Sequence, residues 1–193
     1  MIIRKLFKFE NAHIVIECST VKCRSSLHEH SYKVELLFES NFLDNGQMIY
    51  DFGLMKQNMK ALIDGFDHGI TLWNGDDKDY IKDMKKHSQR WIELPVSPSC
   101  EQFSRIIFLM MDRLLKLTSS VNGEKEVTLN SVIVHETDTG YAQAFYEDAY
   151  SKAMGEINLD EIVFSDEIKN SWSDSELWEK VKRGEGFTNP QSV

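Results

Sequence analysis

The amino-acid sequence predicts an α+β fold, in which a four-stranded antiparallel sheet carries two helices packed on one face. Two observations predict this fold. Apolar residues recur with the period of two typical of a strand in four stretches, residues 2–17, 30–40, 126–136 and 141–147. Between the second and third stretches, apolar residues recur at helical spacing, first over residues 51–64 and again after Ser99. The two helices are therefore inserted between strands 2 and 3.

Length and composition predict one domain over residues 1–150, followed by an acidic C-terminal extension over residues 151–193. The chain has 193 residues, 41% hydrophobic and 27% charged, which is ordinary for a globular protein. Its net charge of -9 argues against nucleic acid as the main partner. No apolar run approaches membrane-spanning length, no secretory signal is recognisable, and the cysteines number three. We therefore expect no membrane partner, reduced thiols and a cytoplasmic location.

Three histidines fall on the first two predicted strands. His13 shares a strand face with aromatic residues, and taken alone it is more readily a hydrogen-bonded core histidine than a metal ligand. His28 and His30 share one face of the second strand, as half of a zinc site or simply as two polar residues at a strand entrance. A hairpin of these two strands would bring His13 beside the pair. The connection, residues 18–27, is long and irregular, as functional loops often are.

The first predicted helix begins with Asp51 as N-cap and runs to about Asp64, where Gly65 ends it and the pair Asp67 and His68 follows. Its spacing predicts a buried face made of Phe52, Met55, Met59, Leu62, Ile63 and Phe66. This face is expected to be plain hydrophobic core.

The second predicted helix begins at Ser99, which forms a capping-box pattern with Gln102. Glu101 lies in its first turn, where a negative charge is favourable in any helix, so position alone does not make it a site residue. The polar residues 74–90 before it predict a surface excursion with a short helix at residues 79–86 and an exposed His87. The buried face of the second helix is expected to contain Phe103, Ile106, Ile107, Met110, Leu114 and Leu117.

The third strand ends on a carboxylate, Glu136, which follows Val132 and Val134 on the same side. An unpaired carboxylate on an apolar face is costly, so Glu136 is either exposed or has a cationic or hydrogen-bond-donating partner. Beyond the last strand, the extension is polar, yet Trp172, Leu177, Trp178 and Val181 are too apolar to leave in water. We expect an ordered arm over residues 151–183 with a short helix after Ser173, outside the catalytic centre, and a looser end over residues 184–193. A disordered acidic tail is the alternative.

Six short motifs, taken together and in this order, resemble the 6-pyruvoyl-tetrahydropterin synthase family, and within it the bacterial 6-carboxytetrahydropterin synthases. The resemblance covers residues 2–148. The motifs are Phe9-x-x-Ala12-His13, Cys23 before Leu27-His28-x-His30-Ser31-Tyr32, Asp51-Phe52, Phe66-Asp67-His68, Leu94-Pro95-x-x-Pro98-Ser99-x-Glu101 and His135-Glu136-Thr137.

This resemblance implies the T-fold (tunnelling fold), in which trimers form a twelve-stranded barrel, two trimers stack into a homohexamer, and active sites lie at subunit interfaces. It implies Zn2+ as the cofactor. The site residues that it implies are His13, His28 and His30 as zinc ligands, Cys23, Asp67 and His68 as proton-transfer groups, and Glu101 and Glu136 in the pterin pocket.

The implied activity is that of a zinc-dependent carbon–oxygen lyase in 7-deazaguanine (queuosine) biosynthesis. It would convert 7,8-dihydroneopterin triphosphate to 6-carboxy-5,6,7,8-tetrahydropterin, releasing acetaldehyde and triphosphate. The alternatives are a 6-pyruvoyl-tetrahydropterin synthase acting on the same substrate and a catalytically inactive pterin-binding T-fold protein.

The chain departs from the family pattern in three places. Glu29 stands between the two histidines where glycine is usual, and the spacing from Cys23 to His28 lies between the usual lengths, which leaves Cys18 as a rival for the base. The extension after Ser151 has no counterpart in short family members.

Overall fold

The computed structural model describes residues 1–193. Its main sheet is built on a long antiparallel hairpin of β1 (Ile2–His13) and β2 (His28–Glu39). The strands β6 (Thr128–His135) and β7 (Tyr141–Phe145) extend this hairpin antiparallel on the β2 side. These four strands are the predicted ones, and their alternation places large apolar side chains such as Phe9, Tyr32 and Val134 on one buried face.

The prediction of a four-stranded sheet is wrong, because the sheet has seven strands in the order β7-β6-β2-β1-β3-β4-β8. Strand β3 (Gly69–Trp73) pairs in parallel with the end of β1, and β4 (Trp91–Leu94) pairs in parallel with β3. The short β8 (Val163–Phe164) pairs antiparallel with β4. Strand β3 is only five residues long and is buried on both faces, so it carries no alternation of buried and exposed residues that marks it as a strand.

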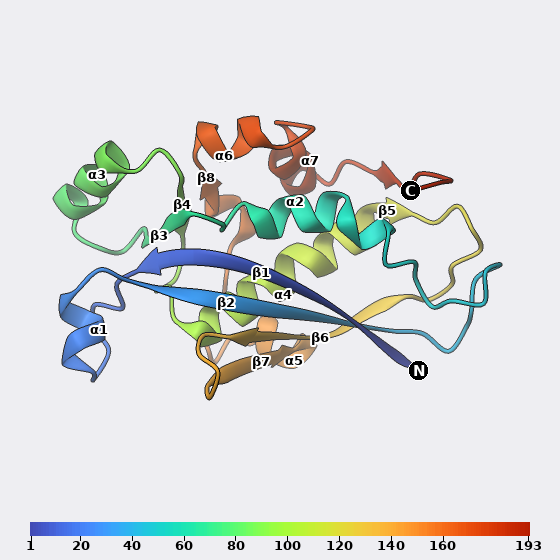
Figure 1. Ribbon diagram of the computed structural model, residues 1–193, viewed down its shortest axis with the longest axis horizontal. Coiled ribbons are helices and arrows are strands. Elements are labelled where there is room, and N and C mark those ends of the chain that lie inside the picture. Colours follow the sequence, from blue (N-terminus) through green and yellow to red (C-terminus); the bar gives the residue numbers. More distant parts are fainter.

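The helices α2 (Asn58–Asp64) and α4 (Cys100–Leu117) cover the apolar face of the sheet (Figure 1). The prediction for α4 is confirmed, since the Ser99 hydroxyl accepts a hydrogen bond from the Gln102 backbone N–H and the predicted apolar face is buried or partly buried. The start of α2 was predicted wrongly. The Asp51 carboxylate caps a local turn by accepting from the Gly53 N–H at 2.7 Å, a 3-10 turn (Leu54–Lys56) follows, and Phe52 is 47% exposed.

Five short elements lie outside this framework. The connection between β1 and β2 contains α1 (Val21–Ser25), and the surface excursion contains α3 (Lys78–His87), as predicted, with His87 exposed. The predicted last strand ends early, because residues 146–149 turn into α5 (Tyr146–Ala149). After α4, the short strand β5 (Thr118–Ser119) forms a separate two-stranded sheet with β9 (Phe187–Thr188).

The C-terminal arm, residues 151–193, packs on the outer side of α2 and α4 through a 3-10 turn (Leu159–Glu161), α6 (Asp166–Ser171) and α7 (Leu177–Arg183). Its side chains Phe164, Trp172 and Trp178 belong to the same hydrophobic cluster as the sheet and α4. Two details differ from expectation. Ser165, rather than Ser173, caps a helix of the arm, and the end is not loose, because β9 pairs with β5.

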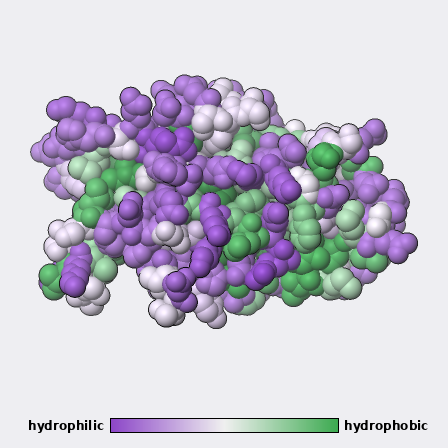
Figure 2. Space-filling model, viewed as in Figure 1, coloured by the Kyte–Doolittle hydropathy of each residue, from purple (hydrophilic) through white to green (hydrophobic).

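Figure 2 shows a largely hydrophilic face over α3 and α6, with apolar residues gathered near the N-terminal end of β1. Ile2, Leu6 and Phe52 are exposed there. Strand β1 pairs with β3 only at Asn11 and Ala12, so the rest of that edge has no strand partner in the chain. None of the helices has the length and apolar character needed to cross a membrane.

Candidate metal centre and proton-transfer groups

The register of the β1–β2 hairpin brings the three histidines together. His13 lies directly opposite His28, and His30 lies two residues further along the same face of β2. The ring centroids are 4.7 Å apart for His13 and His28, 5.4 Å for His13 and His30, and 5.0 Å for His28 and His30. One ligand nitrogen from each ring lies within 4.8 Å of the other two. The sequence prediction that a hairpin would gather these residues is confirmed.

Backbone carbonyls orient two of the three rings. The Nδ1 atom of His13 lies 2.6 Å from the Pro98 carbonyl oxygen, and that of His28 lies 2.9 Å from the Ser26 carbonyl oxygen. A ring that donates from Nδ1 to a carbonyl oxygen presents the lone pair of Nε2, and metal-ligating histidines are usually held in this way. Burial, supported by the positive charge of His28 and His30, lowers the pKa of His13 to about 4, so its ring is neutral at neutral pH.

The hydrogen bonding of the cluster indicates that it can hold a metal ion. His13 is 1% exposed, and its Nε2 atom is buried without any hydrogen-bond partner in the chain. An unpartnered buried polar atom is costly, and a metal ion held by His13, His28 and His30 would remove that cost. Three imidazole ligands with an open fourth position are typical of catalytic zinc.

Glu136 borders the cluster. Its Oε1 atom lies 3.9 Å from Nε2 of His13 and 4.0 Å from Nε2 of His30, and it accepts a hydrogen bond of 3.2 Å from the Tyr32 hydroxyl. Of the two alternatives that the sequence left open for Glu136, the structure shows a hydrogen-bond-donating partner, and the side chain is also partly exposed. Burial and the Glu136 charge raise the pKa of Tyr32, so this hydroxyl stays a donor. Glu101 is exposed in the first turn of α4, next to Cys100.

Asp67 and His68 form a second, separate group in the turn between α2 and β3. The Asp67 carboxylate accepts from the Glu10 backbone N–H at 2.8 Å and lies 2.8 Å from Nδ1 of His68. Burial alone would raise the pKa of Asp67, but these hydrogen bonds and the nearby His68 and Arg90 hold the pKa below its usual value. His68 adopts a φ of 52°, an uncommon conformation for this residue type, which the Glu10 carbonyl fixes by accepting from the His68 N–H at 2.8 Å.

The two groups open on opposite faces of the hairpin. His13, with Phe9 and Asn11, points to the face covered by the helices, whereas His68 lines a hollow together with Ala12 and Glu29, which point the other way. Glu29, the residue between the two cluster histidines, therefore faces away from the metal site. Within one chain the structure does not bring His68 to the histidine cluster.

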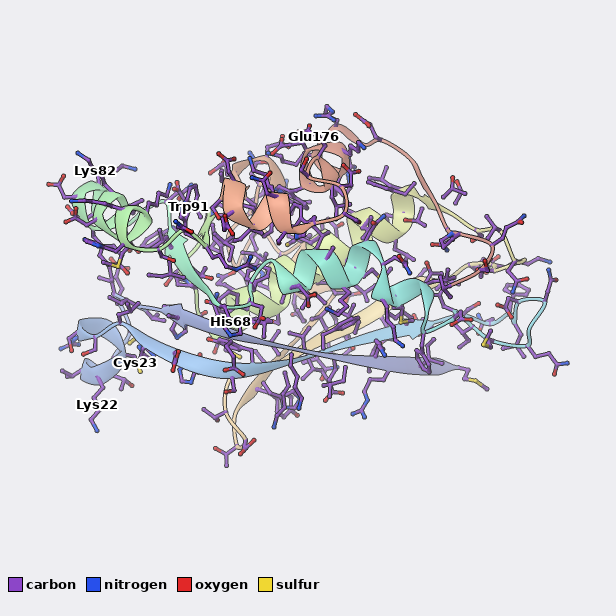
Figure 3. The ribbon with its side chains drawn as sticks, turned by 45° about the horizontal axis from the view of Figure 1, so that its top comes forward. Lys22, Cys23, His68, Lys82, Trp91 and Glu176 are labelled. Atoms are coloured by element: carbon purple, nitrogen blue, oxygen red, sulfur yellow. The ribbon has the colours of Figure 1, made fainter.

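Cys23 lies in α1, at the end of the hairpin that carries the histidines (Figure 3). The Val15 N–H donates to its carbonyl oxygen at 3.3 Å, and the residue is half-buried. Figure 3 shows Cys23 apart from His68, which comes from the turn after α2. The rival Cys18 is also half-buried, and its thiol donates to the Thr20 carbonyl oxygen.

Sequence reasoning missed three residues that position these groups. Tyr32 falls on a predicted strand and in one of the family motifs, but neither indicates that its hydroxyl donates to Glu136. Asn11, 1% exposed, donates to the Phe66 carbonyl and accepts from the Thr71 hydroxyl, which ties β1 to the turn that carries His68. Its amide on an otherwise apolar strand face was the available signal. Arg90 donates to the Asp67 carbonyl at 2.9 Å, and nothing in its sequence context indicated this.

Fold and site together define a class of α+β protein with a cluster of three histidines, able to hold a metal ion, at the end of a long hairpin. The chain belongs to the 6-pyruvoyl tetrahydropterin synthase family, whose model matches residues 2–147. It is 35% identical over 182 residues to a protein of Helicobacter pylori strain J99 named 6-carboxy-5,6,7,8-tetrahydropterin synthase, covering 94% of this chain and 91% of the relative. A protein of the same name from Aquifex aeolicus is 26% identical, and the alignment covers 73% of this chain and 95% of that relative.

Solved structures agree with the fold. An uncharacterised protein of Wolinella succinogenes superposes with a TM-score of 0.59 at 19% identity, covering 76% of this chain and 98% of that one. The 6-pyruvoyl tetrahydropterin synthase of Caenorhabditis elegans superposes with a TM-score of 0.53 at 17% identity. The superposition covers 75% of this chain and 94% of that one. The family match ends at residue 147, whereas the Helicobacter alignment must continue through most of the arm to span 182 residues.

Proposed function

We propose that this chain is a zinc-dependent lyase that converts 7,8-dihydroneopterin triphosphate to 6-carboxy-5,6,7,8-tetrahydropterin, in the biosynthesis of 7-deazaguanines. The observation that carries the proposal is the histidine cluster with its unpartnered Nε2 atom, bordered by the Glu136 carboxylate. The relatives named above, which share the family and most of the chain length, support the choice of reaction. Release of triphosphate breaks a carbon–oxygen bond, release of acetaldehyde breaks a carbon–carbon bond, and one water molecule is consumed to supply the second oxygen of the carboxyl group.

Different residues bind the metal and the pterin ring in this proposal. Zinc, when bound by His13, His28 and His30, supplies Lewis acidity toward the side-chain hydroxyls of the substrate. Glu136 and Glu101 hold the pterin, because a carboxylate can accept two parallel N–H bonds from the amidine edge of the ring. The Tyr32 hydroxyl keeps Glu136 in place for this contact.

Proton transfer is assigned to Cys23 and His68. The Asp67 carboxylate contacts Nδ1 of His68 and thereby leaves Nε2 as the atom that exchanges a proton with substrate. His68 opens away from the metal cluster of its own chain, so in this proposal it serves the cluster of a neighbouring subunit. The free edges of β1 and β7 and the exposed Ile2 and Leu6 support a closed assembly, which we propose to be a hexamer of two trimers.

Product analysis tests the proposed reaction. The zinc-loaded protein, incubated with 7,8-dihydroneopterin triphosphate, is expected to release acetaldehyde and 6-carboxy-5,6,7,8-tetrahydropterin in equal amounts. A 6-pyruvoyl product without acetaldehyde would identify the alternative, a 6-pyruvoyl-tetrahydropterin synthase. The description of the matching family supports this alternative. No turnover with the metal fully loaded would contradict both.

The choice of base is tested within the connecting loop. Cys23→Ala is expected to keep zinc and pterin binding and to lose turnover, whereas Cys18→Ala keeps all three. The two thiols are both half-buried and five residues apart, so each variant is a control for the other. Inactivity of Cys18→Ala alone would transfer the role to Cys18.

A further inference from the structure

A second cleft lies beside His68, between β1, α2 and the arm. Its volume is about 710 Å³. His68 and Asp67 form part of its wall, so this cleft adjoins the proposed proton-transfer group directly. The other lining residues come from parts of the chain that are distant in sequence: Lys8, Lys56, Gln57, Asn58, Lys60, Ala61, Asp64, Arg90, Ser171, Trp172 and Ser173.

The cleft is cationic in a chain whose net charge is -9. It contains Lys8, Lys56, Lys60 and Arg90 against the two carboxylates of Asp64 and Asp67. Lys60 pairs with Asp64, but the exposed Lys8 and Lys56 form no ion pair. Like charges gathered without counter-charges repel one another, and an anion that lies between them removes that repulsion.

Arg90 is held in place for such a contact. Its Nε and one terminal nitrogen donate to the Asp67 and Asp64 carbonyl oxygens at 2.9 Å and 3.1 Å. These bonds fix the guanidinium against the end of α2 while its charge stays unpaired by any carboxylate. A guanidinium fixed in this way loses little side-chain entropy on binding an anion.

The arm contributes neutral polar groups to the opposite wall. The Ser173 hydroxyl is exposed there, the Ser171 hydroxyl already donates to the Ile168 carbonyl oxygen at 2.6 Å, and the indole N–H of the buried Trp172 has no acceptor within the chain. These residues lie beyond the family domain, but the Helicobacter alignment, which spans 182 of the residues, must include them.

We propose that this cleft binds the polyphosphate group of the substrate. The inference rests on the proposed function, because it takes the substrate to carry a triphosphate on the side chain that reacts. That group is attached next to the carbons at which protons move, so it must lie beside the proton-transfer residue, and the cleft is the cationic surface that adjoins His68. The metal side instead offers Glu101 and Glu136, whose carboxylates repel phosphate groups.

Calorimetric titration of the zinc-loaded full chain with inorganic tripolyphosphate tests the proposal. The double variant Lys8→Ala/Lys56→Ala is expected to bind at least about tenfold more weakly, and to show a shallower dependence of affinity on salt. Both side chains are exposed, so the fold is not at risk. Lys82→Ala, on the exposed face of α3, is the matched control and should bind like the wild type. Equal affinity in the double variant and the wild type would overturn the proposal.

A charge test addresses the arm separately. Ser173→Asp adds a negative charge to the cleft wall, whereas Ser173→Asn adds a neutral group of nearly the same size. We expect tripolyphosphate to bind several-fold more weakly to the first variant and about equally well to the second. If both bind like the wild type, the arm is not part of the binding surface and the proposal is wrong as stated.

The outcome is distinguishable from a failure of the proposed function. Tripolyphosphate binding involves no turnover and no pterin, so it can be found even if the predicted products are not formed. If the predicted products are formed, the Lys8→Ala/Lys56→Ala variant should raise KM for the triphosphate substrate about tenfold and change kcat little. An unchanged KM would remove the cleft from substrate binding and leave the reaction standing.

Discussion

The metal cluster and the Asp67–His68 pair are built in different ways. The cluster is set by the register of one hairpin, with His13 only 1% exposed and its ring fixed by the Pro98 carbonyl. The pair lies in a turn, and the side chain of His68 is 76% exposed. The cluster faces the helices, and the pair faces the other side of the hairpin. This difference is the reason for proposing that a complete site combines the cluster of one subunit with the pair of another.

The largest effect is expected at the cluster. His28→Ala or His30→Ala removes one of the three proposed zinc ligands. Zinc affinity should therefore fall by more than about 100-fold, which is more than is usually lost when a residue that only hydrogen-bonds to a ligand is changed. Elemental analysis after dialysis measures the retained metal. His87→Ala, at an exposed histidine of α3, is the control and should retain zinc fully. Equal zinc content in His28→Ala and the wild type would remove the metal centre from this account.

A large effect of a different kind is expected at the pair. His68→Ala should lower kcat by about 10²–10⁴-fold, the usual range for a lost general acid or base, with zinc content unchanged. Asp67→Asn should give a smaller loss of kcat, because the ring keeps a hydrogen-bond partner at Nδ1, whereas an amide, which can donate as well as accept, no longer holds the ring in a single tautomer. Loss of zinc from His68→Ala would mean that the two groups are not separate.

The arm should matter for stability rather than for the metal. Trp178 is fully buried and donates from its indole N–H to the Ile162 carbonyl at 2.9 Å. Trp178→Ala should therefore lower the free energy of unfolding by about 3–5 kcal/mol, as measured by urea denaturation of the zinc-loaded protein. A variant that keeps the wild-type midpoint would show that the arm does not contribute to folding. Reduced zinc content at temperatures well below unfolding would tie the arm to the cluster instead.

The smallest effect is expected at Tyr32. Tyr32→Phe keeps the ring in the core and removes only the hydroxyl that donates to Glu136. Glu136 is partly exposed and regains water, so we expect KM for the pterin substrate to rise about tenfold or less, with zinc retained. A loss of zinc would mean that the hydroxyl supports the cluster through His13, which lies 3.4 Å away, rather than Glu136.

The sequence predicted the gathering of the three histidines well, because strand period and hairpin register are local rules. Once the stretches around His13 and His28 are strands that pair, the side on which each histidine points follows from counting residues. Helix α4 was predictable for the same reason, since Ser99 and the apolar spacing after it are local signals.

The features that the sequence did not predict depend on contacts between segments that are distant along the chain. Strand β3 is a short, mostly buried segment whose sequence could equally belong to a helix, and only its pairing with β1 and β4 makes it a strand. The separation of His68 from the cluster depends on the turn that Asn11 and Arg90 fix across the chain. The end of the arm is ordered by pairing with β5, residues 118–119, which no pattern within the arm indicates.

Subunit complementation tests the central claim most directly. His28→Ala and His68→Ala chains, each inactive alone, are unfolded together, refolded with zinc and assayed as one mixed assembly. Random mixing places an intact cluster beside an intact His68 at roughly one interface in four, so about a quarter of wild-type activity should return. Each variant refolded alone is the control. If the mixture stays as inactive as its components while its size matches that of the wild-type assembly, the complete site lies within one chain and the account is wrong.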